Sequence, residues 1–309
     1  MIDVRRQADR LREAVRQATA RDRTDEVLFA MGQLQCSLQE VRRPTTLNDA
    51  EFKVFSQYGE DGAIQFLLRH VAPCDPSFIE IGVQSYRESN TRFLASNNNW
   101  RGLAIDGSSD HLAFIRGTEL GWRADVLPVR TFVTKENIND VIESHGYTGD
   151  VGLVSIDVDG MDYWLLEALE VVRPTILIVE FNSIFGPSAA VTVPYTPTFV
   201  CGEAHWSHQY FGASLSALTA LADRKGYALV GATKHAVNAF FVLRESLGDL
   251  NEVPPASAWR PSRFLSSRNQ QGDLSYVRDH VDRLRLIADL PLSVLPSGQE
   301  REIRDIFDL

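Results

Sequence analysis

The sequence predicts an α/β protein built on a mostly parallel sheet of seven strands. Between residues 77 and 180, five short apolar runs alternate with connecting segments, several of them with helical periodicity, the pattern of strand–helix–strand units. Two further apolar runs, 227–230 and 238–243, lie too close together for a helical crossover, so they should pair antiparallel. The expected architecture is therefore a parallel sheet whose last strand is antiparallel, preceded by a helical N-terminal arm.

Composition limits the classes of protein to be considered. The 309 residues are enough for one large α/β domain with appendages, and the net charge of −10 argues against a nucleic-acid-binding role. Cys36, Cys74 and Cys201 are far apart and form no CxxC pair, which argues against a disulfide framework or structural zinc. Asp3 and the absence of an apolar run near the start argue against a signal peptide. We expect a soluble, cytoplasmic protein with neither nucleic acid nor membrane as partner.

The chain divides into three parts by pattern. Residues 1–48 are expected to form a helical arm, residues 49–245 the sheet domain, and residues 246–309 a C-terminal extension. The arm or the extension could mediate a homo-oligomer, and we expect a charged helix at about 274–290. The apolar stripes of the arm are Leu11, Val15 and Ala18, then Val27, Leu28, Met31 and Leu34.

The first strand, predicted at Phe78–Ile81, contains an acid and leads into a glycine. A carboxylate such as Glu80 at the carboxyl end of a buried strand is costly unless it meets a ligand or a backbone donor. Gly82 would let the backbone approach a ligand. A single glycine, in place of GxGxxG, suits a nucleoside ligand without a diphosphate.

The second strand ends in Asp106, which lies 106 − 82 = 24 residues after Gly82. This is near the spacing of about 20 at which an acid binds ribose hydroxyls in the dinucleotide fold. The alternative is that Asp106 only begins a turn with Gly107. Upstream, the glycine-rich loop that holds Gln57 and Gly59 could close over a polar ligand or simply precede a helix cap.

Polar residues follow the fourth and fifth strands, predicted at 151–156 and 175–179. Asp157 and Asp159 follow the first of these strands, and Glu180 and Asn182 follow the second. Such an oxygen-rich cluster suits Mg²⁺, although the acids could instead bind an amino group, substrate hydroxyls or backbone donors. Asp162 is predicted as the N-cap of the next helix, and the third strand is predicted at 129–133.

Residues 183–213 show no clear element, and a loop of that length is usually functional or disordered. Its aromatic residues and prolines argue against disorder. His205 and His208 are candidates for a general base, because an unperturbed histidine has a pKa near 6.5. Tyr195 and Tyr210, with Asp159, are the candidate contacts to the acceptor.

Three motifs in order along the chain resemble the FkbM-like S-adenosylmethionine-dependent methyltransferases. They are Ser56–Gly62, Phe78–Gly82 with Ser89-Asn90-Thr91, and Ser155–Asp162, and the resemblance covers roughly residues 50–245. It implies a Rossmann-like class I methyltransferase domain that methylates hydroxyl groups of sugars or natural products.

The resemblance also implies roles for individual residues. Glu80 and Gly82 would line the methionine part of the cofactor, and Asp106 would hold the ribose. In metal-assisted relatives an acid and a later acid pair hold Mg²⁺; here these would be Asp157, Glu180 and Asn182, the last two split by Phe181. The full set expected at the cofactor is Gln57, Gly59, Glu80, Gly82, Asn90, Thr91, Asp106, Gly107, Ser108 and Asp157.

The function expected from the sequence is methyl transfer from S-adenosylmethionine to a hydroxyl of a small polar acceptor, with or without Mg²⁺. His205, His208 or Asp157 would accept the proton of that hydroxyl. Three alternatives stay open: a nicotinamide-dependent oxidoreductase, a glycosyltransferase using Asp157-Val158-Asp159 as a DxD metal site, and a non-catalytic binding protein.

Overall fold

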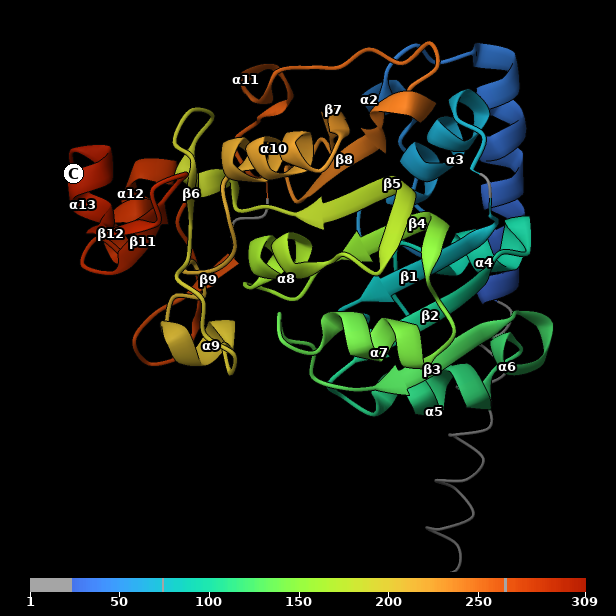
Figure 1. The fold of residues 1–309 in the computed structure, drawn as a ribbon, viewed down its shortest axis with the longest axis horizontal. Coiled ribbons are helices and arrows are strands. Elements are labelled where there is room, and N and C mark those ends of the chain that lie inside the picture. The colour runs from blue at the N-terminus through green and yellow to red at the C-terminus, as the bar shows by residue number, and fades with distance from the viewer. Residues whose placement is uncertain (1–23, 74, 264–265) are drawn as a thin grey trace, which may run out of the picture.

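A seven-stranded sheet forms the centre of the computed structural model, which describes residues 24–73, 75–263 and 266–309. The strand order is β3-β2-β1-β4-β5-β8-β7 (Figure 1). Strands β3 to β5 run parallel, whereas β8 runs antiparallel to both β5 and β7. The structure thus confirms the predicted Rossmann-like sheet with an antiparallel last strand. The strands are β1 Ser77–Ile81, β2 Arg101–Asp106, β3 Val126–Arg130, β4 Gly149–Ile156, β5 Val172–Glu180, β7 Tyr227–Ala232 and β8 Asn238–Leu243.

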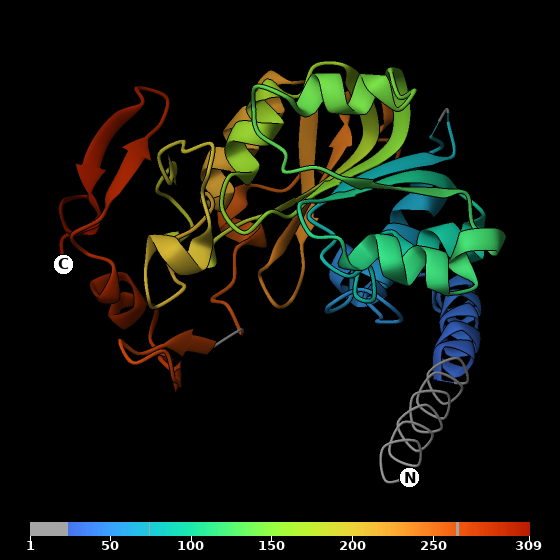
Figure 2. The same ribbon diagram turned by 90° about the horizontal axis from the view of Figure 1, so that it is seen from below.

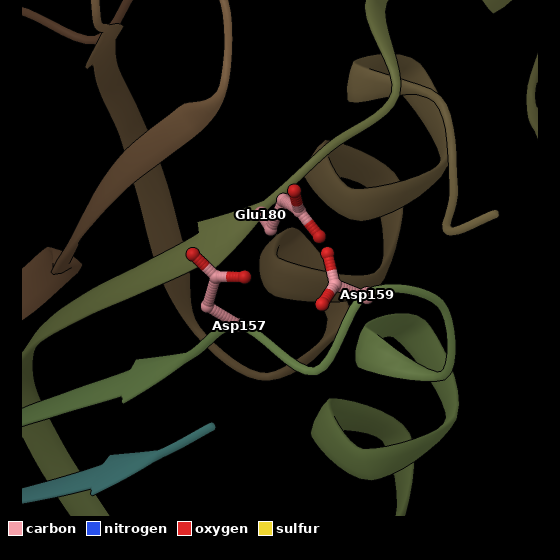
Figure 3. A group of neighbouring side chains, drawn as sticks. All are labelled: Asp157, Asp159 and Glu180. Carbon is pink, nitrogen blue, oxygen red and sulfur yellow. The ribbon is translucent and has the colours of Figure 1, made fainter. Parts of the chain in front are cut away.

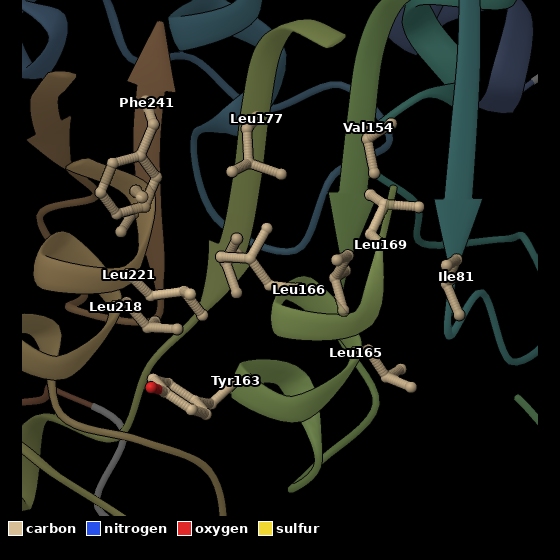
Figure 4. Close-up of a cluster of buried hydrophobic side chains, with 14 of the residues drawn as sticks. Ile81, Val154, Tyr163, Leu165, Leu166, Leu169, Leu177, Leu218, Leu221 and Phe241 are labelled. Atoms are coloured by element: carbon tan, nitrogen blue, oxygen red, sulfur yellow. The ribbon is translucent and has the colours of Figure 1, made fainter. Parts of the chain in front are cut away.

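Helices cover both faces of this sheet, and each face has its own apolar core. On one face Leu165, Leu166 and Leu169 of α8 and Leu218 of α10 pack against strand residues such as Leu177 (Figure 4). On the other face α3, α4 and α5 pack around β1 and β2. The covering helices are α7 Ile138–Ser144, α8 Asp162–Ala168 and α10 Leu215–Arg224, then α3 Glu60–His70, α4 Arg92–Asn98 and α5 Asp110–Gly117. Shorter helices are α2 Leu47–Ala50, α6 Leu120–Arg123, α11 Pro255–Ala258 and the 3₁₀ turn η2 Arg244–Ser246.

The third strand differs from its predicted position by three residues. We expected 129–133 with Pro128 just outside, but β3 runs from Val126 to Arg130 and includes Pro128. Strand β3 lies at the edge of the sheet and pairs only with β2. Proline has no N–H to donate, and on the outer side of an edge strand no hydrogen bond to a neighbouring strand is lost. Phe132, predicted inside the strand, therefore lies in the loop after it.

The segment 183–213, predicted to have no regular element, contains three short ones. They are the 3₁₀ turn η1 Ser183–Phe185, strand β6 Val191–Thr192 and helix α9 Cys201–Ala204. Strand β6 pairs antiparallel with β11, Pro291–Val294, which pairs in turn with β12, Gln299–Glu302. Residues about 100 positions apart therefore form one three-stranded sheet.

This small sheet has its own apolar core, shared between the insertion and the C-terminal extension. Phe185 and Val191 come from the insertion, and Leu284, Leu292 and Ile303 come from the extension. Figure 2 shows the extension at one end of the molecule, beside α9. The charged helix expected at 274–290 is present but shorter, as α12 His280–Leu286. The start of that range instead forms β10 Leu274–Tyr276, in a hairpin with β9 Ser266–Arg268, and the extension ends in α13 Ile303–Phe307.

The N-terminal arm is described from residue 24 and forms a helix over 24–42, which ends before Pro44. The stripe of Leu11, Val15 and Ala18 lies outside the described residues. One face of the helix packs on the domain: Leu28 lies against the cluster of Val54, Phe55 and Phe93. The Gln39 amide donates to the carbonyls of Ala50 and Gly62.

Cys36 and Cys201 are free thiols, and Cys74 lies outside the described residues. Within the described ranges, no helix combines the length and the apolar character that crossing a bilayer requires.

Candidate functional site

Two adjoining cavities open at the carboxyl ends of the parallel strands, the edge at which open α/β sheets bind ligands. One has a volume of about 1040 Å³ and the other about 370 Å³. Gly82, Asp157 and Asp159 line both. A ligand could therefore lie in the smaller cavity and extend past these residues into the larger one.

The smaller cavity lies beyond β2, with Asp106, Gly107 and Ser108 in its wall. One carboxylate oxygen of Asp106 accepts from the Gln84 amide at 2.7 Å, and the other accepts from the Ser108 amide at 2.7 Å. Asp106 thus shapes the turn, as the simpler interpretation proposed, and also stands in the cavity wall. Each oxygen retains a lone pair for a further donor. Phe132, Tyr195 and Phe199 supply aromatic surface to the same cavity.

Gly82 allows two strand ends to meet. Its φ is +91°, and a Cβ at this position would lie 1.6 Å from the carbonyl oxygen of Asp157. The Asp157 amide donates to the Ile81 carbonyl beside it at 3.0 Å. We expected Gly82 to let a ligand approach the backbone. Its immediate neighbour is instead the backbone of Asp157. Gly82 still lines both cavities, so a ligand could contact the part of Gly82 that Asp157 does not cover.

Glu80 is satisfied by the loop that follows its strand. The residue is 4% exposed, and its carboxylate accepts from the amides of Asn90 and Thr91 at 2.8 and 3.1 Å and from the Ser89 hydroxyl at 2.6 Å. The Thr91 hydroxyl donates to it as well. Glu80 therefore holds the 89–91 loop in place while forming part of the wall of the larger cavity. Of the loop, Asn90 lines the cavity, whereas Thr91 is fully buried behind it.

The loop before α3 uses its acids in a similar way. Asp61 accepts from the amides of Val54, Phe55 and Ser56 at 2.7–2.8 Å, and burial raises its pKa to about 6. Glu60 accepts from the Tyr58 and Gly59 amides at 2.9 Å. These bonds fix the backbone that presents Gln57 and Tyr58 to the larger cavity, whereas Gly59 lines neither cavity.

Three carboxylates converge where the cavities meet. Asp157, Asp159 and Glu180 each offer an oxygen within 4.8 Å of the others (Figure 3). Asp157 follows β4 and Glu180 ends β5, so the parallel pairing of the two strands brings them together. Asp159 reaches the cluster because the chain turns through a φ of +54° there, and not because the strand continues. Strand β4 itself ends at Ile156, as predicted.

The carboxylates perturb one another. Desolvation, followed by the charges of Asp159 and Asp162, raises the pKa of Asp157 well above its usual range. Desolvation, followed by the charge of Asp157, also raises the pKa of Glu180 well above its usual range. Desolvation also raises the pKa of Asp159, against an opposing contribution from His208. Such a cluster favours a proton, an ammonium group or a metal cation among its oxygens.

Asp162 is the first residue of α8, not the N-cap as predicted; that position belongs to Met161. Its carboxylate accepts from the Val158 and Gly160 amides at 2.9 and 3.0 Å, so it stabilises the turn that carries Asp159.

Asn182, predicted as the third metal ligand, uses its amide within the chain. Its oxygen accepts from the Ile184 amide at 3.2 Å, and its nitrogen donates to the carbonyls of Gln209 and Phe211. The residue lines the larger cavity, but the third convergent oxygen comes from Asp159, which we had assigned to the acceptor.

The two candidate histidines are separated. His208 lines the larger cavity, next to Gly202. His205 lies outside both cavity walls, where its Nδ1 and the Ser207 hydroxyl are 2.7 Å apart and its ring packs on Trp206. His208 is therefore the candidate base at the cavity.

The two candidate tyrosines are also separated. Tyr195 lines the smaller cavity and donates to the Glu136 carboxylate at 2.5 Å, with the Lys135 ammonium 4.1 Å from its ring centre. Tyr210 is buried in the core below β11 and donates to the Pro291 carbonyl at 2.6 Å. It lines neither cavity, so its assignment to the acceptor is corrected to a structural one.

Several cavity residues were not predicted. Asn238 of β8 is opposite Glu180 in the ladder, and Arg268 and Arg283 come from the C-terminal extension. The Arg268 amide donates to the Ser207 carbonyl at 3.2 Å, which places β9 beside the His208 loop. No local pattern marks these residues, because they reach the cavity through pairings distant in sequence.

No family model matches the chain, and no curated protein matches it. The solved structures that resemble it include methyltransferases, at low similarity. The CurJ carbon methyltransferase has a TM-score of 0.35 and 10% identity, over 59% of this chain and 52% of that one. The match thus spans about half the length of the CurJ chain.

Two further structures were determined with S-adenosylhomocysteine (SAH). The O-methyltransferase from Bacillus cereus has a TM-score of 0.33 and 17% identity, over 54% of this chain and 72% of that one. The N-terminal domain of EvdMO1, solved with SAH and D-fucose, has a TM-score of 0.36 and 13% identity, over 54% and 75%. Similarity at this level decides neither the activity nor the substrate of the present chain.

Proposed function

We propose that the protein is an S-adenosylmethionine-dependent methyltransferase of the FkbM-like type that acts on a hydroxyl of a polar acceptor. The observation that carries this proposal is the pair of cavities that meet at Gly82, Asp157 and Asp159. The smaller suits a nucleoside, with an acid for ribose hydroxyls and aromatic side chains for a base. The larger exceeds what the rest of the cofactor would fill and leaves room for an acceptor.

The residues present fit this cofactor. Asp106 can accept hydrogen bonds from two vicinal hydroxyls, and the acids at the junction of the cavities suit a cationic centre. When bound, S-adenosylmethionine supplies an activated methyl group on a sulfonium, so alignment of the acceptor provides most of the acceleration. The acceptor oxygen must lose a proton as it gains the methyl group. His208 is placed to accept that proton, with Asp157 as the alternative.

We also propose that Asp157, Asp159 and Glu180 can hold a divalent cation. Glu180 Oε2 is buried and has no hydrogen-bond partner in the described structure, and carboxylate oxygens are the ligands Mg²⁺ prefers. A cation there would lower the pKa of an acceptor hydroxyl and orient it.

The acceptor side of the cavity is built largely by parts outside the sheet. Arg268, Leu274 and Arg283 of the extension line it together with Phe199 and His208 of the insertion. We therefore propose that the extension contributes to acceptor selection. The arginines, the histidine and the carboxylates in this lining suit a hydroxylated molecule such as a sugar or a glycosylated natural product.

Isothermal titration with SAH tests the proposal directly. Wild type should bind SAH. Asp106→Asn should bind SAH at least about tenfold more weakly, because the amide replaces the carboxylate that would accept hydrogen bonds from both ribose hydroxyls. Asp110→Asn is the matched control: Asp110 lies four residues on, lines neither cavity and should leave affinity unchanged. Absence of SAH binding to folded wild type would end the proposal.

The site of methylation is tested by product analysis. Wild type is incubated with S-adenosylmethionine and a panel of hydroxylated and amino-bearing acceptors, and the products are identified by mass spectrometry and NMR. We expect methyl ethers. Exclusive formation of methylamines would show that the enzyme transfers methyl to nitrogen.

A further inference from the structure

The larger cavity is lined by acids from the sheet domain and by arginines from the C-terminal extension. Glu80, Asp157 and Glu180 belong to the ends of parallel strands or follow them directly. Among the described residues of the extension no acid lines the cavity, and the charged lining residues are Arg268 of β9 and Arg283 of α12. We call these two residues the arginine wall. It is a local excess of positive charge in a chain whose net charge is −10.

The acids of the cavity have counter-groups of their own. The carboxylate of Glu80 accepts hydrogen bonds from the 89–91 loop, and Glu88 forms an ion pair with Lys53 at 3.0 Å. The remaining three acids form the carboxylate cluster at the junction of the two cavities (Figure 3). The cavity therefore offers a bound molecule two environments, one that attracts positive charge and one that attracts negative charge.

Arg268 is held at the cavity by its backbone. Its amide donates to the Ser207 carbonyl at 3.2 Å, and its side-chain Nη1 donates to the Gly272 carbonyl at 3.3 Å. No acid in the described part of the chain forms an ion pair with it. A guanidinium presents five N–H donors in a planar fork, which matches two oxygens of a carboxylate or a phosphate. An anionic ligand would supply the counter-charge that Arg268 lacks within the described ranges.

Arg283 is fixed in place by the core of the extension. The next residue, Leu284, is 3% exposed and packs in one cluster with Ile184 and Phe185. Arg283 is itself 3% exposed, and its Nε donates to the Val277 carbonyl at 2.7 Å. A side chain fixed by packing loses little conformational freedom when it binds an anion. Burial lowers the pKa of Arg283, because a desolvated guanidinium is less stable, and an anion beside it would offset this cost.

We propose that the acceptor carries a carboxylate or a phosphate, which the arginine wall binds while the hydroxyl to be methylated lies toward the carboxylate cluster. This inference rests on the function proposed above and narrows its substrate class to an anionic hydroxylated molecule, such as an acidic sugar or a sugar phosphate. Arginine binds either group through two parallel, charge-assisted hydrogen bonds. The carboxylate cluster would repel the same group, so the two sets of charges also determine which end of the acceptor faces the methyl donor.

Isothermal titration of the full chain with three sugars tests this inference. D-glucuronate, D-glucose 6-phosphate and D-glucose share a hydroxylated ring and differ in charge, and each is titrated with and without saturating SAH. We expect at least one anionic sugar to bind about tenfold or more tightly than glucose, with an affinity that falls as salt is added. A preference for glucuronate identifies a carboxylate site, a preference for glucose 6-phosphate a phosphate site, and equal affinity for both a site for either. Binding of neither anion more tightly than glucose would overturn the inference.

Variants of the arginine wall test the assignment of the two residues. Arg268→Gln should bind the preferred anionic sugar about tenfold more weakly and leave the affinity for SAH unchanged, because Arg268 lines the larger cavity and not the smaller one. Arg283 is buried, so it is replaced by lysine, which keeps the charge and loses the planar fork; Arg283→Lys should weaken the same binding several-fold.

Arg285→Gln is the matched control for both variants. Arg285 lies on the same helix as Arg283, is exposed, pairs with Asp282 at 2.8 Å and lines neither cavity, so its replacement should leave sugar binding unchanged. Thermal unfolding checks that each variant is folded. Wild-type affinity in both Arg268→Gln and Arg283→Lys would overturn the assignment.

The inference and the proposed function fail in different ways. If folded wild type binds SAH but does not distinguish the anionic sugars from glucose, the methyl-transfer proposal stands and only the acceptor class is wrong. If it binds an anionic sugar through Arg268 but does not bind SAH, the proposed methyl transfer is wrong and the anion site remains as a binding site.

Discussion

Gly82 is the residue on which the junction of the two cavities depends most directly. Gly82→Ala would force a Cβ to within 1.6 Å of the Asp157 carbonyl oxygen, and the backbone φ of +91° adds strain for any L side chain. We expect a loss of about 2–4 kcal/mol in unfolding free energy, together with loss of SAH binding. Chemical denaturation and titration measure the two effects.

Gly107→Ala is the matched control for the effect on unfolding free energy. A Cβ at Gly107 would approach Phe132 no closer than 3.3 Å, and the position requires no positive φ. A Gly82→Ala protein as stable as wild type would show that the two strand ends can separate at little cost.

Asp162 should make stability depend on pH. Burial raises its folded-state pKa to about 7, above the ordinary value of 3.8, so the folded state binds the proton more tightly than the unfolded state between these values. Stability from this group is complete below pH 4 and is lost as the pH rises toward 7, by up to about 1.4 kcal/mol per pH unit. Asp162→Asn should flatten this part of the curve of unfolding free energy against pH. An unchanged slope would show that Asp162 is ionised throughout.

At the scale of single residues, the sequence located the acids better than it located their partners. Asp157 and Glu180 could be expected at one edge because each follows an apolar strand. Asp159 could not be placed, because its position depends on a left-handed turn that no sequence period announces. The sequence indicated that the carboxylate of Glu80 needs a hydrogen-bond donor. It could not show whether a ligand or the backbone supplies that donor, because the answer depends on how the 89–91 loop folds.

Among the elements, the pairing of β6 with β11 connects the insertion to the C-terminal extension. Leu292 of β11 is fully buried in their shared core. Leu292→Ala should cost about 2–5 kcal/mol, and the loss should fall on the extension because this core is separate from those of the main sheet. Limited proteolysis should cut residues 266–309 sooner than in wild type while the sheet domain stays intact.

The exposed Leu274 provides the comparison, since Leu274→Ala removes a side chain that is 53% exposed and should leave protease resistance unchanged. If the whole chain of Leu292→Ala were digested at once, the extension and the sheet would form one cooperative unit.

The elements that could be predicted are those with local signatures. The central strands are continuous apolar runs, and α8 and α10 show helical periodicity. Strand β6 has only two residues and exists because β11 lies beside it, about 100 positions later in the chain. Such an element has no signature of its own, which is why residues 183–213 looked irregular. The shift in β3 has a different cause: proline is tolerated on an edge strand, and edge status depends on the whole sheet.

For the molecule as a whole, the carboxylate cluster predicts a response to divalent cations. Asp157 and Glu180 extend from adjacent central strands, so a cation that binds only the folded protein should raise its melting temperature. At a Mg²⁺ concentration of 100 times Kd the gain is about 2.7 kcal/mol. A thermal shift assay with and without Mg²⁺ measures it without reference to catalysis.

Asp159→Asn should reduce this shift, because it replaces one of the three convergent carboxylates by a neutral amide. Asp110→Asn, which alters an acid away from the cluster, should leave the shift at the wild-type size. A wild type that shows no shift at millimolar Mg²⁺ would remove the metal from the proposed mechanism.

The late position of β11 also matters while the chain is being synthesised. Chains begin to fold from the N-terminus as they leave the ribosome, and the main sheet is complete in sequence by residue 243. The smaller cavity, whose lining residues all precede residue 200, can therefore form early. The part of the larger cavity that the insertion and the extension build together must wait until residue 294 has emerged, because β6 gains its partner only then. Under the function proposed above, a nascent chain should acquire cofactor binding before it can select an acceptor.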